Sequence, residues 1–359
     1  MLFPAISLNL KCRDISLAII FVICLPISAV QADELLLKNG DRLTGEVLNE
    51  ADGVLKFKTS YAGILSIKWK DVSEVRTDKP MTLLLEDDGV LTGAVIKTQG
   101  DKLQIENTLD GSEDLLLQSS VKEINPEPWR INKGNKLSGM INVSVEYDRG
   151  NNNNDEIDLD GRLVFRRFLD RVSLYGEYDE NRTNEITTKL KWLATADYDY
   201  FPRRDWDYMI EAQDWFVGVG VNLKKDEFAD LRLRSRFGPH IGYQFFESKP
   251  LNLFLRGGVE AVKEEYLTEE ENEYWASTWR LMFDQYIFRE KLQFYFVSDG
   301  LYGFDSPDKI IVDNWIGLRF PLYAGFIASI EAETDYDSQP ATDAEALSVF
   351  YRLKLGYKF

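Results

Sequence analysis

The end of the chain alternates strictly between apolar and polar residues and stops on an aromatic side chain. The segment from Ala344 to Phe359 reads AEALSVFYRLKLGYKF. Because successive side chains of a β-strand point to opposite faces, one face from Leu347 onward is wholly apolar and the other is mostly polar and basic. The segment therefore predicts a strand with one face against apolar surroundings and the other against polar ones.

A strand of this kind at the end of a chain, closing in Tyr-x-Phe, is typical of bacterial outer-membrane barrels. We therefore expect a protein of the outer membrane, in contact with its lipid. We also expect the barrel-assembly machinery to read the C-terminal strand through four apolar residues. These residues are Tyr351, Leu355, Tyr357 and Phe359.

The first 32 residues have the organisation of a secretory signal peptide. Two basic residues precede an apolar run over 17–27, and Ala32 supplies a small residue for cleavage. The alternative is an uncleaved anchor, but the run is shorter than the about 20 residues that span a bilayer. Both cysteines, Cys12 and Cys24, lie in this segment. The mature chain is therefore expected to have neither disulfides nor thiolate chemistry.

The composition argues for a β-rich membrane protein and against a nucleic-acid partner. The chain has 60 Asp and Glu against 42 Lys and Arg, a net charge of −18. Binding to phosphates requires a basic surface, which this balance disfavours. Aromatic residues make up 13% of the chain, and with 24 glycines they fit an all-β protein with aromatic belts at the membrane interfaces.

An internal repeat with an offset of 48 residues fills the first third of the mature chain. Residues 43–45 and 91–93 both read Leu-Thr-Gly. Each copy has about five short apolar runs separated by turn residues. This predicts two small SH3-like or Sm-like β-barrels over 33–78 and 79–126 that pack together, followed by a linker over 127–136. The pair is either a periplasmic adaptor for an envelope partner or a spacer without a ligand.

From 137 to 359 the alternation recurs in about twelve segments, which predicts an antiparallel transmembrane β-barrel with an even strand number. The connections alternate between short turns and longer acidic or Asn-rich loops. We therefore expect both ends of the barrel segment, and the repeats before it, in the periplasm. One connection, 202–214, is long where a short turn is expected, so ten and fourteen strands remain open.

The inward face of the predicted barrel carries many charges of both signs. The predicted lumen residues are Arg232, Arg234, Arg236, His240, Arg256, Glu260, Arg280, Arg319, Glu331, Glu333, Arg352 and Lys354. They describe either a polar channel with a site for an anionic solute, or a salt-bridged interior that holds the barrel in shape. Small barrels fill their lumen with side chains and open channels are the norm at about 16 strands, so twelve strands favour a packed or narrow lumen.

The sequence lacks the residues that catalysis or metal binding would need. His240 is the only histidine, and no Gly-x-Ser-x-Gly motif accompanies it. One histidine without a mature cysteine disfavours a transition-metal site, and the acidic loop 268–273 lacks the spacing of a calcium loop. We therefore expect no enzymatic activity, cofactor or metal.

Several motifs of the barrel segment carry a family resemblance. They are DEFADL at 226–231, Gly238, IGYQF at 241–245 and GYKF at 356–359. Through them, residues 135–359 resemble the YdiY-like family, named for salt-induced outer-membrane proteins and of unknown function. The resemblance implies an outer-membrane barrel and supplies no catalytic residues. Pro239 and His240 stand where the family tends to have small residues, so the family's lumen shape does not carry over.

Two functions follow from these observations. The first is a structural or narrow-pore barrel of the outer membrane. The second is an envelope adaptor, in which residues 33–126 bind a protein or cell-wall partner and the barrel is the anchor.

Overall fold

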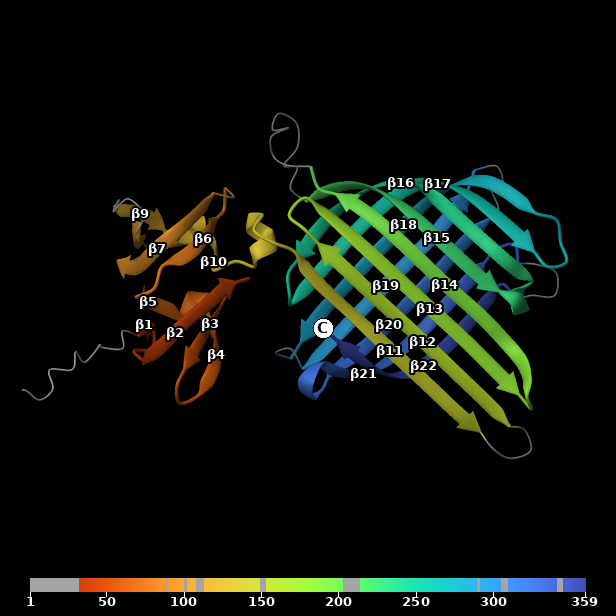
Figure 1. The fold of residues 1–359 in the computed structure, drawn as a ribbon, viewed down its shortest axis with the longest axis horizontal. Coiled ribbons are helices and arrows are strands. Elements are labelled where there is room, and N and C mark those ends of the chain that lie inside the picture. The colour runs from red at the N-terminus through yellow and green to blue at the C-terminus, as the bar shows by residue number, and fades with distance from the viewer. Residues whose placement is uncertain are drawn as a thin grey trace, which may run out of the picture. The chain divides into compact units, whose positions relative to one another are not determined.

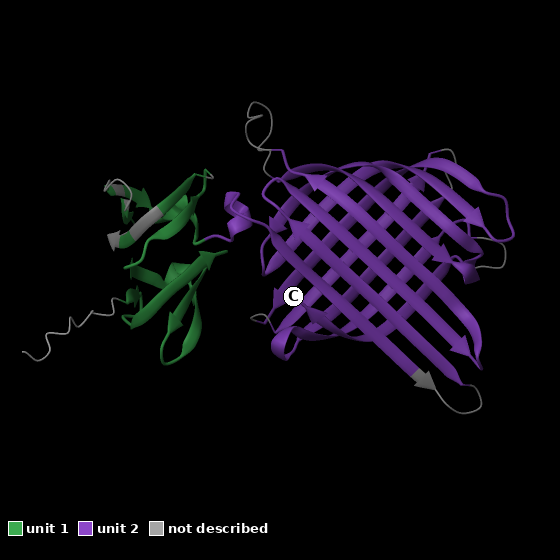
Figure 2. Cartoon of the chain, in the orientation of Figure 1, with its two compact units in different colours: residues 1–125 green, residues 126–359 purple. Residues whose placement is uncertain are grey.

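A computed structural model describes residues 32–87, 89–99, 102–107, 113–148, 153–202, 214–288, 291–304, 309–340 and 345–359. The predicted signal peptide lies outside the described residues, except for Ala32. The chain divides into two compact units, residues 1–125 and 126–359, and each is described here by itself (Figure 2). No helix among the described residues is long and apolar enough to cross a membrane.

The first unit consists of two sets of five short strands, one set from each copy of the repeat. The first set is β1 (Asp33–Leu37), β2 (Arg42–Ala51), β3 (Val54–Thr59), β4 (Gly63–Lys68) and β5 (Val72–Arg76). The second set is β6 (Met81–Leu85), β7 (Val90–Gln99), β8 (Lys102–Asn107), β9 (Glu113–Leu117) and β10 (Val121–Ile124). A single-turn 3-10 helix precedes the last strand of each set, η1 (Trp69–Asp71) and η2 (Gln118–Ser120).

The two copies share one sheet instead of closing into separate barrels. The strand order is β1-β5-β7-β6-β10-β2-β3-β4, with β8 and β9 continuing from β7. Strands of different copies pair where Arg76 lies opposite Lys97 and where Ile124 lies opposite Glu50. Five short strands bury too little apolar surface to stand alone. The pairing between strands of different copies therefore joins the two predicted modules into one folding unit.

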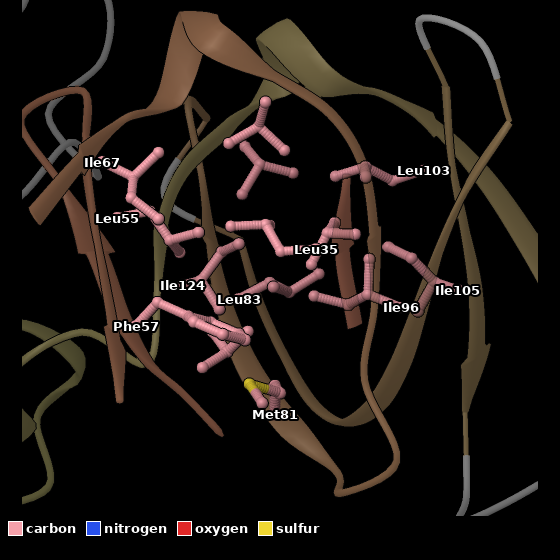
Figure 3. Close-up of a cluster of buried hydrophobic side chains, with 14 residues drawn as sticks. Leu35, Leu55, Phe57, Ile67, Met81, Leu83, Ile96, Leu103, Ile105 and Ile124 are labelled. Atoms are coloured by element: carbon pink, nitrogen blue, oxygen red, sulfur yellow. The ribbon is translucent and has the colours of Figure 1, made fainter. Parts of the chain in front are cut away.

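One hydrophobic core serves both copies, as Figure 3 shows. Leu55 and Phe57 come from the first copy, Leu83 and Ile96 come from the second, and all four are fully buried. Glu50 of β2 is also buried in this unit, and it accepts a hydrogen bond from the Gly53 amide at 3.1 Å. Burial, with the buried Glu123 of β10 nearby, raises the pKa of the Glu50 carboxyl to about 7.

The second unit is a closed antiparallel barrel of twelve strands, in agreement with the predicted number (Figure 1). Its strands are β11 (Lys136–Asp148), β12 (Asn154–Arg166), β13 (Asp170–Thr183), β14 (Ile186–Tyr200), β15 (Trp215–Asp226), β16 (Leu231–Glu247), β17 (Leu251–Tyr266), β18 (Asn272–Ile287), β19 (Leu292–Gly303), β20 (Ile310–Pro321), β21 (Phe326–Asp337) and β22 (Leu347–Lys358). Among the described residues, 3-10 helices accompany them at η3 (Pro128–Ile131), η5 (Glu227–Ala229) and η6 (Tyr323–Gly325). The C-terminal strand closes the ring against β11, with Tyr357 opposite Ile141.

The two ends of the barrel differ in their connections. One end, called the turn end, holds the short connections after β12, β16, β18 and β20, together with the start of β11 and the end of β22. The opposite end, called the loop end, holds the connections after β11, β13, β15, β17, β19 and β21. The long connection after β14 also belongs to the turn end, and its residues 203–213 lie outside the described residues.

The outer face of the barrel is apolar and exposed. Residues such as Phe237, Ile241 and Leu353 point away from the lumen and lack protein neighbours that would bury them. Exposed aromatic residues lie near both ends of the strands. They include Tyr198, Tyr200, Phe245, Tyr357 and Phe359 toward the turn end, and Tyr178 and Tyr336 toward the loop end. An apolar band between two aromatic girdles is the surface of an outer-membrane barrel.

Candidate functional site in the barrel lumen

Charged side chains from opposite sides of the barrel meet in the lumen at the loop end. Lys191 of β14 contacts Glu333 and lies 2.8 Å from Asp335, both on β21. Lys224 of β15 lies 3.1 Å from Asp313 of β20. Neither pair of strands is adjacent in the ring, so these ion pairs bridge the lumen.

The bridges belong to a larger network, called the loop-end network. Its carboxylates are Asp158, Glu177, Asp179, Glu264, Asp313, Glu333, Asp335 and Asp337, and its cations are Lys189, Lys191, Lys224, Arg234, Lys309 and Arg352. Arg352 lies close to three carboxylates of this network. It contacts Glu333 and lies 2.7 Å from Asp179 and 3.2 Å from Asp158. With eight carboxylates against six cations, the network is acidic.

A second network fills the middle of the lumen, and its charges balance. Arg236 lies 2.7 Å from both Glu260 and Asp299. Asp197 lies 2.8 Å from Arg256 and 3.2 Å from Arg280. Arg280 also reaches Asp299 at 3.1 Å. Three of the predicted lumen arginines, Arg236, Arg256 and Arg280, are therefore neutralised by three carboxylates.

The predicted charges on the last two strands also pair with each other. Lys354 donates to Glu331 of the neighbouring strand and to Asp160 of β12, both at 2.6 Å. Tyr295 donates to the same Glu331 at 2.6 Å. The Arg319 guanidinium lies 3.6 Å from the centre of the Tyr295 ring. Glu331 therefore accepts hydrogen bonds from two side chains, Lys354 of β22 and Tyr295 of β19.

His240 is buried in the wall between the middle of the lumen and the turn end. Its Nε2 lies 2.7 Å from Asp199 Oδ1 and 3.4 Å from Arg256 Nη1. Asp199 also accepts a hydrogen bond from Arg171 Nε at 2.8 Å. A Cβ atom on Gly218 would lie 2.5 Å from the ring, so the imidazole fits because this neighbour has no side chain. In the described part of the chain its polar contacts are these charged groups, which is the environment of a lumen residue.

Arg232 does not take its predicted place in the lumen. Its side chain is 59% exposed and lies 2.6 Å from Glu265 at the loop end. The register between β16 and β17 shifts between Leu231 and Leu233, which marks a β-bulge. A bulge breaks the period of two on which the prediction rested, and Leu231 is buried instead.

At the turn end, the rings of Trp129, Phe201, Phe216 and Phe254 surround Arg166 and Arg171. We call this group the aromatic stopper, which was not predicted from the sequence. The Arg166 guanidinium lies 3.9 Å from the centre of the Phe201 ring and 4.9 Å from that of Trp129, and it pairs with Glu247 at 3.0 Å. Arg130 donates to the Glu247 carbonyl oxygen at 2.6 Å. The predicted linker therefore belongs in part to the barrel unit, because Trp129 of η3 is buried against it.

Further aromatic rings line the same end of the lumen. Arg171 lies within 5.3 Å of the ring centres of Phe201, Phe216 and Phe254. Phe216 and Phe254 stand at inward positions of their strands, where polar residues are the rule in this barrel. Large apolar residues on an otherwise polar strand face were the signal in the sequence that could have revealed the stopper.

Three carboxylates of the loop-end network lie close enough to hold a metal ion. The carboxylates of Glu177, Asp179 and Glu333 have oxygens within 4.8 Å of one another. Each has a basic neighbour, because Lys191 contacts Glu333 and lies 3.5 Å from Glu177, and Arg352 lies 2.7 Å from Asp179. The ammonium and guanidinium groups therefore already supply the positive charge that a metal would bring.

Comparison with known proteins places the barrel in a family. The profile of a family described as "Protein of unknown function, DUF481" matches residues 141–359. This confirms the family resemblance predicted from the motifs, since YdiY-like proteins belong to that family. No protein of the curated set matches the chain.

Solved structures of similar shape are outer-membrane barrels. The NanC porin is 13% identical, with a TM-score of 0.37, over 62% of this chain and 98% of that one. The KdgM porin is 11% identical, with a TM-score of 0.32, over 62% and 99%. The outer membrane channel DcaP of Acinetobacter baumannii is 10% identical, with a TM-score of 0.29, over 91% and 94%.

Proposed function

The chain belongs to the family of proteins of unknown function DUF481, and we propose from its own geometry that it is a narrow-pore or structural barrel of the outer membrane. The observation that carries the proposal is the pair of bridges across the lumen, Lys191 to Glu333 and Asp335, and Lys224 to Asp313. Side chains that meet in the middle of a barrel leave passage only for water and small solutes.

Conductance in planar bilayers tests this proposal. The folded chain should give small discrete steps or none. Replacing both partners of one bridge, in Lys191→Ala with Glu333→Ala, removes side-chain volume without leaving the lysine unpaired, and should raise the conductance severalfold. The matched control is Arg232→Ala with Glu265→Ala, an ion pair at the exposed rim. Large conductance steps from the unaltered chain, or equal conductance of both double variants, would contradict a lumen closed by these side chains.

We also propose that the turn end faces the periplasm, with the first unit on that side. Short turns are the periplasmic connections of bacterial barrels and longer loops are the extracellular ones. Protease added to intact cells should leave the first unit uncleaved until the outer membrane is permeabilised. Cleavage of the first unit in intact cells would reverse the orientation.

An adaptor function has its own support in the first unit. The strands β4 and β9 occupy the edges of the sheet and correspond in the repeat. Both expose apolar residues, with Ile64 61% exposed on β4 and Leu115 59% exposed on β9. Exposed apolar edge strands are sites where an extended segment of a partner adds to a sheet.

Site-specific crosslinking tests the adaptor function. A photoreactive residue at position 64 or 115 of the full chain should trap the same envelope component in cells. Asn39, exposed in the turn after β1, provides the control position. Equal adducts at all three positions, or none at the two edges, would remove the support for an adaptor.

A further inference from the structure

Two arginines of the lumen have no acidic partner, although the other lumen arginines do. Arg162 of β12 has its Nη1 2.6 Å from the Sδ of Met282 on β18, across the lumen. Arg319 of β20 lies over the ring of Tyr295. Among the described residues, neither has a carboxylate oxygen within 4.0 Å.

A third cation without an acidic partner lies at the same end of the barrel. Lys358, near the end of β22, donates to the Tyr286 hydroxyl at 3.1 Å and lies 5.2 Å from the centre of its ring. Every other arginine or lysine that faces the lumen from the described strands has an ion-pair partner. These are Arg166, Arg171, Lys189, Lys191, Lys224, Arg234, Arg236, Arg256, Arg280, Lys309, Arg352 and Lys354.

The three cations face the same part of the lumen wall, formed by β18 and its neighbours β19 and β20. Met282, which Arg162 contacts, and Tyr286, which Lys358 contacts, lie four residues apart on that strand. Tyr286 lies opposite Gln293 of β19, and Gln293 lies opposite Arg319 of β20. Arg319 therefore lies on the same row of the sheet as Tyr286. We call Arg162, Arg319 and Lys358 the turn-end cations.

One carboxylate lies among the turn-end cations, and it is held by amides. Asp284 of β18 accepts from Asn252 Nδ2 at 2.9 Å and from Gln293 Nε2 at 2.6 Å. The charged groups that act on Arg162 are Asp284 together with Arg171, Arg280 and Arg319. Among the described side chains of this region, Asp284 is the one acid without an ion-pair partner, against three cations without one. This contrasts with the acidic loop-end network.

The turn-end cations are less buried than most of the paired arginines of the lumen. Arg162 and Arg319 are half-buried and Lys358 is exposed, whereas the paired arginines Arg234 and Arg236 are buried. A cation held in a lumen without a partner is costly, and an anion that enters the lumen offsets that cost. The planar guanidinium group donates two parallel hydrogen bonds to a carboxylate or a phosphate.

We infer that the turn-end cations form a binding site for a small oxyanion, a molecule with a carboxylate or a phosphate group. Arg162 and Arg319 supply the paired donors, and the Tyr295 ring holds the Arg319 guanidinium in place. Lys358 and the Tyr286 hydroxyl add donors at the rim of the site. This inference rests on the proposed function as a narrow pore, because the site would define the class of solute that the pore admits.

Calorimetric titration of the full chain, folded in detergent, tests the site with succinate and with inorganic phosphate as separate probes. Chloride at matched ionic strength is the reference. The double variant Arg162→Gln with Arg319→Gln should weaken binding of the preferred probe at least tenfold. The exposed Arg232→Gln should leave it unchanged. The stronger probe identifies the carboxylate or the phosphate as the ligand group.

Binding no tighter than that of chloride, or undiminished in the double variant, would overturn the site. The heat-modifiable gel shift verifies that the double variant is folded, which is expected because the change removes repulsion between like charges. Bilayer recordings separate the two proposals. A silent bilayer with intact binding would contradict the narrow-pore form of the proposal, support its structural form and leave the site, whereas conductance without binding would contradict the site and leave the pore.

Discussion

Gly139 and Phe359 close the barrel through two backbone hydrogen bonds and one packed ring. The amide of each residue donates to the carbonyl oxygen of the other at 3.0 Å. A Cβ atom on Gly139 would lie 2.5 Å from Cζ of the Phe359 ring. The terminal aromatic side chain therefore lies in a place that only a glycine on β11 leaves free.

The first prediction concerns this closure. Gly139→Ala should displace the Phe359 ring and weaken the barrel by about 1–3 kcal/mol, the cost of overpacking. Gly161→Ala is the matched control, because the nearest atom to a Cβ there is at 3.6 Å. Assembly measured by the heat-modifiable gel shift should fall for the first variant and for deletion of Phe359. Full folding of the Phe359 deletion would show that the ring and its two hydrogen bonds are dispensable.

The second prediction concerns the loop-end network. Arg352→Met leaves Asp158, Asp179 and Glu333 without this cation, and should destabilise the barrel by about 3–5 kcal/mol, the cost of breaking a buried pair. The surface variant Arg232→Met should shift the unfolding midpoint much less, because water screens an exposed ion pair. Urea unfolding of the two variants in the same detergent gives the comparison. Equal midpoints would mean that the buried network contributes no more than a rim pair does.

The third prediction concerns the pH dependence of the first unit. The folded pKa of Glu50 is about 7, above its ordinary value of 4.5. The unfolded chain therefore releases this proton first, and the free energy of unfolding falls as the pH rises from 4.5 to 7. The loss amounts to about 3 kcal/mol above pH 7.

Glu50→Gln should abolish this loss, because the amide keeps an acceptor for the Gly53 amide and carries no charge. Hydrogen exchange of β2 and β10 in the full chain, measured between pH 4.5 and 8, reports the stability of this unit. The exposed Glu34→Gln should retain the pH dependence of the unaltered chain. A flat profile for the unaltered chain would mean that Glu50 stays ionised in the folded unit.

The fourth prediction concerns the aromatic stopper. Trp129→Ala should cost about 3 kcal/mol, the lower end for removing a large buried ring. It should also raise bilayer conductance, since Arg166 loses one of the two rings that hold it. Trp275→Ala removes the same side chain from the exposed outer face of β18. Conductance unchanged in Trp129→Ala would show that the stopper does not limit passage.

The local pattern of residues was sufficient to predict the strands and to predict which face of each strand is apolar. Alternation with a period of two depends on neighbouring residues alone, so twelve strands and an apolar outer face could be predicted. Pairs on adjacent strands, such as Lys354 and Glu331, follow from the same pattern. Where a bulge interrupts the period, at Leu231 to Leu233, the prediction for Arg232 was wrong.

The sequence by itself determined a membrane barrel with a charged lumen, because each strand carries that information in its own residues. Only the tertiary structure decided which charges meet, because contacts across a lumen depend on the register of all twelve strands and on closure of the ring. For this reason Lys191 contacts Glu333 of β21, and Arg162 and Arg319 have no carboxylate partner among the residues that the structure describes. The same holds for the first unit, where the repeat predicted two modules and pairing between their strands made one core.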